Sequence, residues 1–432
     1  MQKISQSIDG DEKSSSITTY ENPVNAKVRV PGSKSYTNRA LVMAALTKGP
    51  VSLRSPLYSD DTEAMIECLT TLGIHIEKEA DQIIVHGDVS AVANKNHLLF
   101  TRDSGTTARF MLALSCIVPG IKTIQGSKRL SERPINDLVN ALREMSAKIE
   151  YIENDYQLPI KVSTSSLSGN SVHLKGDLSS QFCSALLLIS PYISKGLTIH
   201  IAGPLISKPY VDMTLSYMQE WDVKVIEKDG TYRVPEGQSY RKNECLVEGD
   251  YSSAGYFFAI AALTKSKITV ENLNPFSTQP DRKFLDILAK MGNVVTYGEN
   301  EVTVEGRQVI AQSVDMEDCP DQVMTLALLA AFAKGVTRIS GVRSLRHKET
   351  DRVSALRKEL GKMGIRTEEM HNSLIIYGTS PHAAEIETYN DHRIAMAFAV
   401  AGMCLEGMVI CHPEVVNKTF PTFWDILDLL RN

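Results

Sequence analysis

One pattern occurs six times along this chain of 432 residues. Each copy has a short polar loop followed by an apolar run long enough to form a helix, and successive runs begin 68 to 75 residues apart. The runs begin near Ala40, Phe110, Ala185, Tyr256, Met324 and Ile394. A helix that is apolar all round must be buried on every side. This period is longer than that of solenoid repeats, so we interpret each copy as a small subdomain.

The fourth copy shows the order of elements within the repeat. Its apolar helix precedes a β-branched strand at 267–273, and residues 281–291 then carry apolar side chains at helical spacing. Gly292 is placed to end that second helix, and the runs at 294–297 and 301–304 predict a strand pair. Gly73 and Gly364 have the same place in the first and fifth copies. Helices between strands favour crossover connections, so the sequence predicts an α/β protein.

The six copies divide as three plus three. We place the boundary near 243–250, where no low-complexity linker separates the halves. Residues 33–248 then form one domain. Residues 249–432 form the other, and we assign residues 1–32, with the first strand of the chain, to this second domain.

Composition excludes several classes of protein. The net charge is −5 and no basic block stands out, which argues against nucleic acids and membrane surfaces as partners. Residues 1–20 lack the apolar core of a signal peptide, and the apolar run at 324–333 is too short to span a membrane. The seven cysteines are scattered, and neither they nor the histidines have metal-ligand spacing. We expect a cytoplasmic monomer that uses no cofactor or metal.

Three of the polar segments combine cations with the start of a helix. Lys34 and Arg39 flank hydroxyl groups before the first apolar run, and Lys348, Glu349 and Arg352 share one helical turn. His392 and Arg393 occupy the first turn of the last apolar helix, where the helix dipole disfavours a cation. Capped helices and solvated salt bridges can explain the first two segments taken alone. At His392 and Arg393 a cation without a negative partner is costly, so a bound anion explains the segment better than capping alone.

Cations recur at element ends throughout this acidic chain. They are Lys34, Arg39, Arg133, Lys348, Arg352, Arg393 and Lys418. Unpaired N–H groups at helix starts also attract anions. The combination predicts a small polyanionic ligand that carries phosphate and carboxylate groups.

At these residues the chain resembles the 5-enolpyruvylshikimate-3-phosphate synthase family, the 3-phosphoshikimate 1-carboxyvinyltransferases. From about residue 25 to 430 it carries, in family order, the motifs P-G-S-K-S-x-x-N-R, S-S-Q, S-K-P-Y, E-G-D-x-S-S-A, K-E-T-D-R, Y-N-D-H-R and K-T-F-P. The resemblance implies two inside-out α/β domains, each of three βαβαββ units. It also implies transfer of the enolpyruvyl group of phosphoenolpyruvate to the 5-hydroxyl of shikimate 3-phosphate through a non-covalent tetrahedral intermediate, in chorismate and aromatic amino acid biosynthesis.

The resemblance also implies roles for individual residues. Around shikimate 3-phosphate it places Lys34, Ser35, Arg39, Ser179, Ser180, Gln181, Ser207, Tyr210, Asp321 and Lys348. Around phosphoenolpyruvate it places Lys34, Gly105, Arg133, Gln181, Arg352, Arg393 and Lys418, with His392 in support. Asp321 is the expected proton acceptor, Glu349 the expected proton donor, and Lys34 shares in proton transfer. Two acids in different environments can divide these tasks.

The chain departs from the family pattern at Asp103, Ser344 and His347, and an acid at Asp103 would repel phosphoenolpyruvate unless it is paired. Gly105 and Phe110 lie where the family binds glyphosate, so we expect inhibition that competes with phosphoenolpyruvate. One alternative is the UDP-N-acetylglucosamine enolpyruvyl transferase, which uses a loop cysteine that residues 126–134 lack. The other is a non-catalytic anion-binding repeat protein, for which acids beside the cations would have no use.

Overall fold

The computed structural model describes residues 14–17, 19 and 23–430, and the chain divides into two compact units. Unit 2 comprises Gly32–Val247, and unit 1 comprises Glu248–Asn432 together with the chain before Gly32. The stretch at 1–13, on which most of the signal-peptide argument depends, lies outside the described residues.

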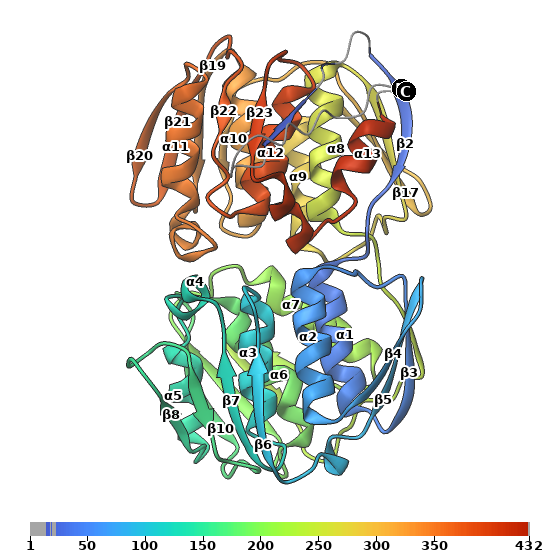
Figure 1. Ribbon diagram of the computed structural model, residues 1–432, viewed down its shortest axis with the longest axis vertical. Helices are drawn as coiled ribbons and strands as arrows, with labels where there is room; N and C mark the ends of the chain where they lie inside the picture. Colours follow the sequence, from blue (N-terminus) through green and yellow to red (C-terminus); the bar gives the residue numbers. More distant parts are fainter. Residues whose placement is uncertain (1–13, 18, 20–22, 431–432) are drawn as a thin grey trace. The chain divides into compact units, whose positions relative to one another are not determined.

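Unit 2 encloses three nearly wholly buried helices with three sheets (Figure 1). The inner helices are α1 (Lys34–Leu46), α3 (Gly105–Ser115) and α6 (Ser180–Ile189). The other helices are α2 (Asp60–Leu72), α4 (Lys128–Ser131), α5 (Asn136–Glu144) and α7 (Pro209–Glu220), with the 3-10 turns η1 (Val89–Ala91) and η2 (Ser190–Tyr192). In α1 every side chain from Tyr36 onward is buried, which agrees with its lack of a polar face.

The sheets of unit 2 have the strand orders β14-β3-β5-β4, β6-β7-β9-β8 and β10-β11-β13-β12. Their strands are β3 (Gly49–Arg54), β4 (His75–Lys78), β5 (Gln82–Gly87), β6 (Asn96–Phe100), β7 (Ile121–Gln125), β8 (Ile149–Tyr151), β9 (Ile160–Val162), β10 (Ser171–Lys175), β11 (Leu197–Ala202), β12 (Ile226–Lys228), β13 (Thr231–Val234) and β14 (Glu244–Leu246). Strand β14 pairs in parallel with β3, so the last strand of the unit joins its first sheet.

Unit 1 repeats the arrangement around the helices α8 (Tyr251–Thr264), α10 (Val323–Phe332) and α12 (His392–Gly402). Its outer helices and 3-10 turns are α9 (Lys283–Lys290), α11 (Arg352–Lys362), α13 (Phe423–Leu429), η3 (Pro280–Arg282), η4 (Pro320–Gln322), η5 (Arg343–His347) and η6 (Pro413–Lys418). Phe257, Phe420 and Phe423 form an aromatic cluster that packs α8 against the C-terminal segment.

The sheets of unit 1 have the strand orders β16-β17-β15-β2, β18-β19-β21-β20 and β1-β23-β22. Their strands are β1 (Ser14–Ser16), β2 (Asn25–Arg29), β15 (Lys267–Glu271), β16 (Val294–Tyr297), β17 (Glu301–Glu305), β18 (Ser313–Asp315), β19 (Gly335–Ser340), β20 (Arg366–Met370), β21 (Ser373–Gly378), β22 (Glu385–Ile386) and β23 (Val409–Cys411). Strand β2 pairs in parallel with β15, more than two hundred residues away in the sequence, and thus belongs to unit 1.

The predicted repeat is present in all six copies, but the last copy differs in its sheet. Gly73, Gly292 and Gly364 all have positive φ angles, between 80° and 104°, which a glycine adopts without strain at a helix end. In the sixth copy the described residues form a sheet of three strands, one of which is β1 from the start of the chain.

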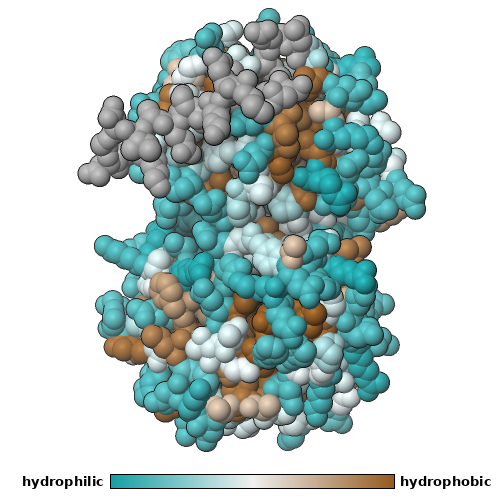
Figure 2. Space-filling model, turned by 45° about the vertical axis from the view of Figure 1, so that its right-hand side comes forward, coloured by the Kyte–Doolittle hydropathy of each residue, from teal (hydrophilic) through white to brown (hydrophobic). Residues whose placement is uncertain are grey.

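The described surface is mostly hydrophilic, with smaller apolar patches on the face that Figure 2 shows. Within the described part of the chain no helix combines the length and the apolar character needed to cross a membrane. Six of the seven cysteines are buried, and burial raises the pKa of the Cys116 and Cys68 thiols to about 12.

Candidate functional site

Four of the six inner helices have a side-chain cap at the polar start that the sequence singled out. The side chains of Ser104, Ser179, Asp250 and Asp391 accept hydrogen bonds from backbone N–H groups in the first turns of α3, α6, α8 and α12. Each bond satisfies one of the donors that a helix start leaves open. Capping therefore accounts for Ser179 and for Asp391, and the remaining polar residues of these loops need another explanation.

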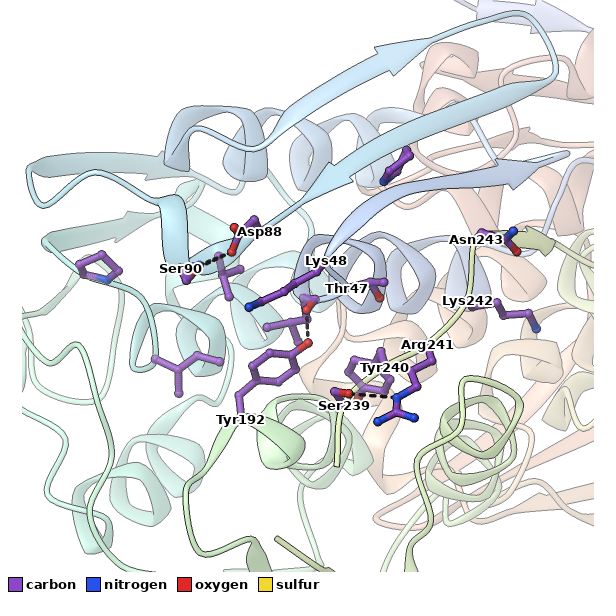
Figure 3. Close-up of a pocket in the computed structure, with 15 residues that line it drawn as sticks. Thr47, Lys48, Asp88, Ser90, Tyr192, Ser239, Tyr240, Arg241, Lys242 and Asn243 are labelled. Atoms are coloured by element: carbon purple, nitrogen blue, oxygen red, sulfur yellow. Dashed lines mark hydrogen bonds between the residues drawn. The ribbon is translucent and has the colours of Figure 1, made fainter. Parts of the chain in front are cut away.

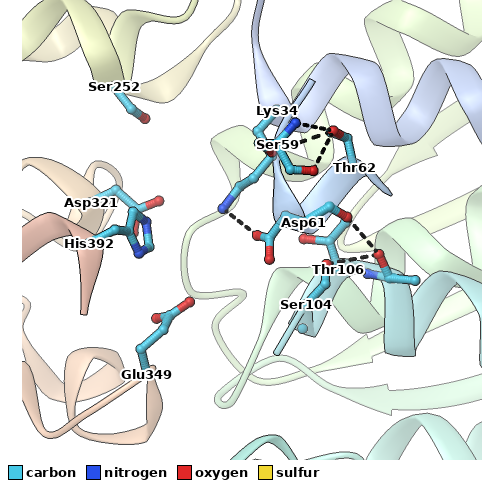
Figure 4. Close-up of polar contacts among 12 residues, drawn as sticks. Lys34, Ser59, Asp61, Thr62, Ser104, Thr106, Ser252, Asp321, Glu349 and His392 are labelled. Carbon is cyan, nitrogen blue, oxygen red and sulfur yellow. Dashed lines mark hydrogen bonds and ion pairs between the residues drawn. The ribbon is translucent and has the colours of Figure 1, made fainter. Parts of the chain in front are cut away.

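Lys34 and Arg39 of unit 2 have different surroundings although they share one helix. The Lys34 ammonium group lies 3.0 Å from a carboxylate oxygen of Asp61, at the start of α2 (Figure 4). Arg39 is buried, and its guanidinium group donates to the Ser35 and Tyr210 carbonyls at 2.9 and 3.0 Å. Burial lowers the pKa of Arg39 to about 10. Arg39 thus connects Ser35 and Tyr210, two residues that are also predicted to bind shikimate 3-phosphate, and fixes their backbone positions.

Gly105 begins helix α3 beside two guanidinium groups. Arg109 donates to the Gly105 carbonyl at 3.0 Å, and a Cβ atom at Gly105 would lie 2.7 Å from Arg109 Nη1 and 2.9 Å from Arg133 Nη2. The absent side chain therefore provides the space for these cations. Gln181 reaches the same helix start, because its amide donates to the Thr106 hydroxyl at 3.3 Å. The structure thus brings together Gly105, Arg133 and Gln181, all predicted to contact phosphoenolpyruvate.

Other predicted residues of unit 2 lie at neighbouring element ends. Ser180 is buried in the first turn of α6, and Ser207 is buried just before α7, in a left-handed conformation with φ of 52°. Tyr210 lies in the first turn of α7. Asp103, which departs from the family pattern, accepts a hydrogen bond from the Ser127 hydroxyl. Asp103 therefore has a hydrogen-bond donor within unit 2.

In unit 1 a buried arginine joins three carboxylates. Arg352, at the start of α11, donates to Asp391 through Nε at 2.7 Å and through Nη2 at 3.2 Å. The same guanidinium contacts Asp321 at 3.2 Å and Glu349 at 3.0 Å. Burial by itself would lower the pKa of Arg352, but Asp391, Glu349 and Asp321 raise it above its ordinary value. The bidentate geometry fixes the orientation of the guanidinium plane.

Arg393 extends this cluster toward helix α8. Its guanidinium lies 2.8 Å from Asp321 and 3.4 Å from the hydroxyl of Ser252. Burial, and then the nearby charge of Asp321, raise the pKa of Asp281 to about 7. Asp321 thus lies between two arginines, while Asp281 can hold a proton near neutral pH. We call Asp321, Glu349, Arg352, Asp391 and Arg393 the unit 1 charge cluster.

The other predicted residues of unit 1 are Lys348, Lys418 and His392. Lys348 is half-buried in the loop before Glu349, and Lys418 is buried at the end of η6. His392 is fully buried, with Nδ1 3.8 Å from Asp391. Figure 4 shows Asp321, His392 and Glu349 on neighbouring segments of this unit.

Two inferences from the sequence change with this geometry. The dipole argument for Arg393 assumed a cation without a negative partner, but Asp321 supplies that partner from η4. The motif E-G-D-x-S-S-A supplied no predicted site residue, yet its Ser252 contacts Arg393. The sequence reasoning also missed Asp61 and Asp281. Their signal was available, because each is an acid at the start of the second helix of a repeat, Asp61 in the first turn of α2 and Asp281 in η3 directly before α9.

A pocket of about 1090 Å³ in unit 2 lies away from all of these residues (Figure 3). Leu46, Thr47 and Tyr192 line it, so it adjoins the C-terminal ends of inner helices, whereas the predicted residues lie at the N-terminal ends. None of the predicted site residues lines the pocket. The candidate site therefore rests on the charge clusters and not on this cavity.

Comparison with known proteins decides the family. The family profile described as EPSP synthase (3-phosphoshikimate 1-carboxyvinyltransferase) matches residues 18–427. The chain belongs to the EPSP synthase family. Over 411 residues it is 41% identical to a 3-phosphoshikimate 1-carboxyvinyltransferase of Vibrio vulnificus, covering 94% of this chain and 96% of that protein. Identity to a protein of the same name from a Shewanella species is 39%, covering 93% and 96%.

The solved structures bear on the fold of this EPSP synthase family member. An EPSP synthase structure from Acinetobacter baumannii superposes with a TM-score of 0.80 at 23% identity, and the match covers 97% of this chain and 98% of that one. The predicted inside-out α/β fold is therefore confirmed. The resemblance stated from the motifs is confirmed as well.

Proposed function

We propose that this protein transfers the enolpyruvyl group of phosphoenolpyruvate to the 5-hydroxyl of shikimate 3-phosphate and releases phosphate. The enzyme class follows from its membership of the EPSP synthase family. The observation that best supports the chemistry is the unit 1 charge cluster, in which two acids with different partners adjoin two buried arginines. An anion-binding scaffold would gain nothing from these carboxylates, since they weaken the attraction of an anion to the arginines.

We assign the roles of the residues within each unit as part of this proposal. In unit 2, Lys34, Ser35, Arg39, Ser179, Ser180, Gln181, Ser207 and Tyr210 bind shikimate 3-phosphate, and Gly105, Arg133, Gln181 and Lys34 contact phosphoenolpyruvate. In unit 1, Arg352, Arg393 and Lys418 bind phosphoenolpyruvate with support from His392, and Lys348 and Asp321 serve shikimate 3-phosphate. We also propose that the two compact units are the domains of the protein.

The proton transfers give the two acids distinct tasks. The attacking hydroxyl must lose a proton as it bonds to C2, and the methylene C3 must gain one to complete the tetrahedral adduct. Elimination of phosphate then removes a proton from C3 again, so that the vinyl ether is restored. Asp321 accepts the hydroxyl proton and Glu349 serves C3, while Lys34 shares in proton transfer. Fixed arginine and lysine charges stabilise the adduct and the departing phosphate.

Phosphate release tests the reaction. We expect release when phosphoenolpyruvate is combined with shikimate 3-phosphate, and none when UDP-N-acetylglucosamine replaces that acceptor. Release only with the nucleotide sugar would favour the rival transferase. No phosphate release with either acceptor would favour the anion-binding protein.

A substitution tests the assignment of the proton acceptor. Asp321→Asn should lower kcat far more than it raises the KM for phosphoenolpyruvate, because it removes a base and keeps the size of the side chain. The matched control is Asp318→Asn, three residues earlier, where the acid is exposed and pairs with Lys283 at 3.4 Å. Equal kcat values for the two variants would remove Asp321 from the mechanism.

The negative net charge and the mostly hydrophilic described surface support a cytoplasmic monomer with small-molecule substrates and without nucleic acid or membrane partners. Size-exclusion chromatography with light scattering checks the oligomeric state.

A further inference from the structure

Two histidines and a glutamate meet on an outer sheet of unit 2. His75 and Glu77 lie on β4, and His86 lies on the neighbouring strand β5. His75 is directly opposite His86 in the antiparallel register. Glu77 is two residues after His75, so the period of the strand places it on the same face. The intervening Ile76 packs against the core, which directs the three polar side chains outward.

The three side chains converge on one point. Glu77 Oε1 lies 3.1 Å from His75 Nε2 and 2.8 Å from His86 Nε2. The imidazole rings are 4.9 Å apart between centroids and are tilted by 33°. The ligand atoms all lie within 4.8 Å of one another. Metal–ligand bonds of about 2.0–2.2 Å in a tetrahedral zinc site place ligand atoms roughly 3.3 Å apart, so small side-chain rotations would complete the geometry.

We propose that His75, Glu77 and His86 form a binding site for a divalent transition metal ion such as Zn²⁺ or Ni²⁺. Two imidazoles and one carboxylate are the donors that these ions prefer, whereas Ca²⁺ and Mg²⁺ prefer oxygen ligands. Both Nε2 atoms already face the same carboxylate oxygen, so a cation bound between the three side chains would take the place of the hydrogens between them, with each neutral imidazole ligating through Nε2. Water completes the coordination, because the His75 side chain is 68% exposed.

The site is separate from the proposed catalytic machinery. No residue assigned to a substrate belongs to it, and the assigned residues of unit 2 lie at or beside helix starts whereas these three lie on strands. Among the described residues, this is the group in which three histidine, cysteine or acidic side chains bring their ligand atoms within 4.8 Å of one another. A bound ion would cross-link the side chains of β4, the edge strand of this sheet, and its neighbour β5, and so stabilise the pairing of these two strands.

Calorimetry on the full chain without an affinity tag tests the site, with ZnCl₂ and NiCl₂ as probes. We expect one ion to bind per chain. His75→Asn and His86→Asn should each weaken binding by more than about tenfold, the factor that corresponds to 1.4 kcal/mol. Added Zn²⁺ should also raise the thermal midpoint of the wild-type protein and leave that of His86→Asn unchanged, because an ion bound to the folded state stabilises it.

His200→Asn is the matched control. His200 lies opposite His173 on paired strands, and these rings also stack, with centroids 5.2 Å apart. Glu144 lies 3.3 Å from His173, whereas His200 Nε2 contacts the hydroxyl of Ser171 at 3.1 Å. The two imidazoles therefore do not converge on one carboxylate as His75 and His86 do. This variant should bind Zn²⁺ as tightly as the wild type does.

Circular dichroism and phosphate release without added metal establish that each variant is folded and active. Equal affinity of the wild type and His86→Asn would overturn the proposal. So would an equal loss of affinity in His200→Asn, since that result would show nonspecific binding to surface histidines.

Discussion

The contacts of Arg352 lead to a quantitative prediction for the variant Arg352→Met. The guanidinium is 1% exposed and holds both oxygens of Asp391, which is fully buried. Methionine keeps much of the buried volume and removes the charge. Asp391 would then stay in the core without the guanidinium that both of its oxygens contact.

Removing one partner of a buried ion pair destabilises a protein by about 3–5 kcal/mol. We expect a loss in this range for unit 1, a large part of the roughly 5–15 kcal/mol that an ordinary domain has. The double variant Arg352→Met/Asp391→Asn should recover about 2–3 kcal/mol of the loss, because the buried charge has been removed as well. Asparagine keeps the cap of α12, since it is an equally good N-cap residue.

Each unit contains one tryptophan, which allows the measurement to be made on unit 1 alone. Trp424 lies in α13 and Trp221 ends α7. In a Trp221→Phe background, the fluorescence of Trp424 in urea reports the unfolding of unit 1. A separate unfolding curve for this unit matters because two units need not unfold together.

Arg357→Met is the control on the same helix. Arg357 is 48% exposed and pairs with Glu369 at 3.0 Å, so its loss should lower the free energy of unfolding by less than about 1 kcal/mol. Equal effects of the Arg352 and Arg357 variants would refute the reasoning. The reasoning would also be refuted if the stability lost in Arg352→Met/Asp391→Asn equalled the sum of the losses in Arg352→Met and Asp391→Asn.

Three further predictions concern other buried groups. Gly105→Ala should leave the fold intact and raise the KM for phosphoenolpyruvate and the inhibition constant of glyphosate, because its Cβ displaces the flexible guanidinium groups of Arg109 and Arg133; steady-state kinetics checks this. The pKa of Asp281 is raised to about 7, so the folded state keeps a proton that the unfolded chain loses near pH 4, and stability should fall as pH rises toward 7. Asp281→Asn should remove this slope from urea midpoints measured across the range. Lys122 is buried and donates to the carbonyls of Val118, Gly120 and Thr164 at 2.7–2.9 Å. Lys122→Met should therefore lower the free energy of unfolding by about 1–3 kcal/mol, measured by thermal unfolding, because these acceptors lose their donor.

The repeat was predictable because it depends on local patterns. An apolar run such as that of α10 must be buried on all sides, and a glycine such as Gly292 ends a helix where φ is positive. Both properties can be read from a few neighbouring residues. The family, too, could be recognised from motifs in order, because each is a short run of residues around an element end.

The partners of the charged residues could not be predicted in this way. The cation at Arg393 was visible in the sequence, but Asp321, which pairs with it, lies 72 residues earlier. The ion pair between Lys34 and Asp61 and the raised pKa of Asp281 likewise depend on which loops meet. The same holds for His75 and His86, whose pairing depends on strand register.

The sequence by itself determined the six-fold repetition, the buried helices and the enzyme family, since local hydrophobic patterns and short motifs carry that information. Only the tertiary structure decided how the copies differ. It distributes the acids and cations of separate loops into buried pairs, and it joins β2 to β15 and β14 to β3 across long stretches of chain. Charge interactions and strand pairing depend on distance in space, and the fold sets those distances.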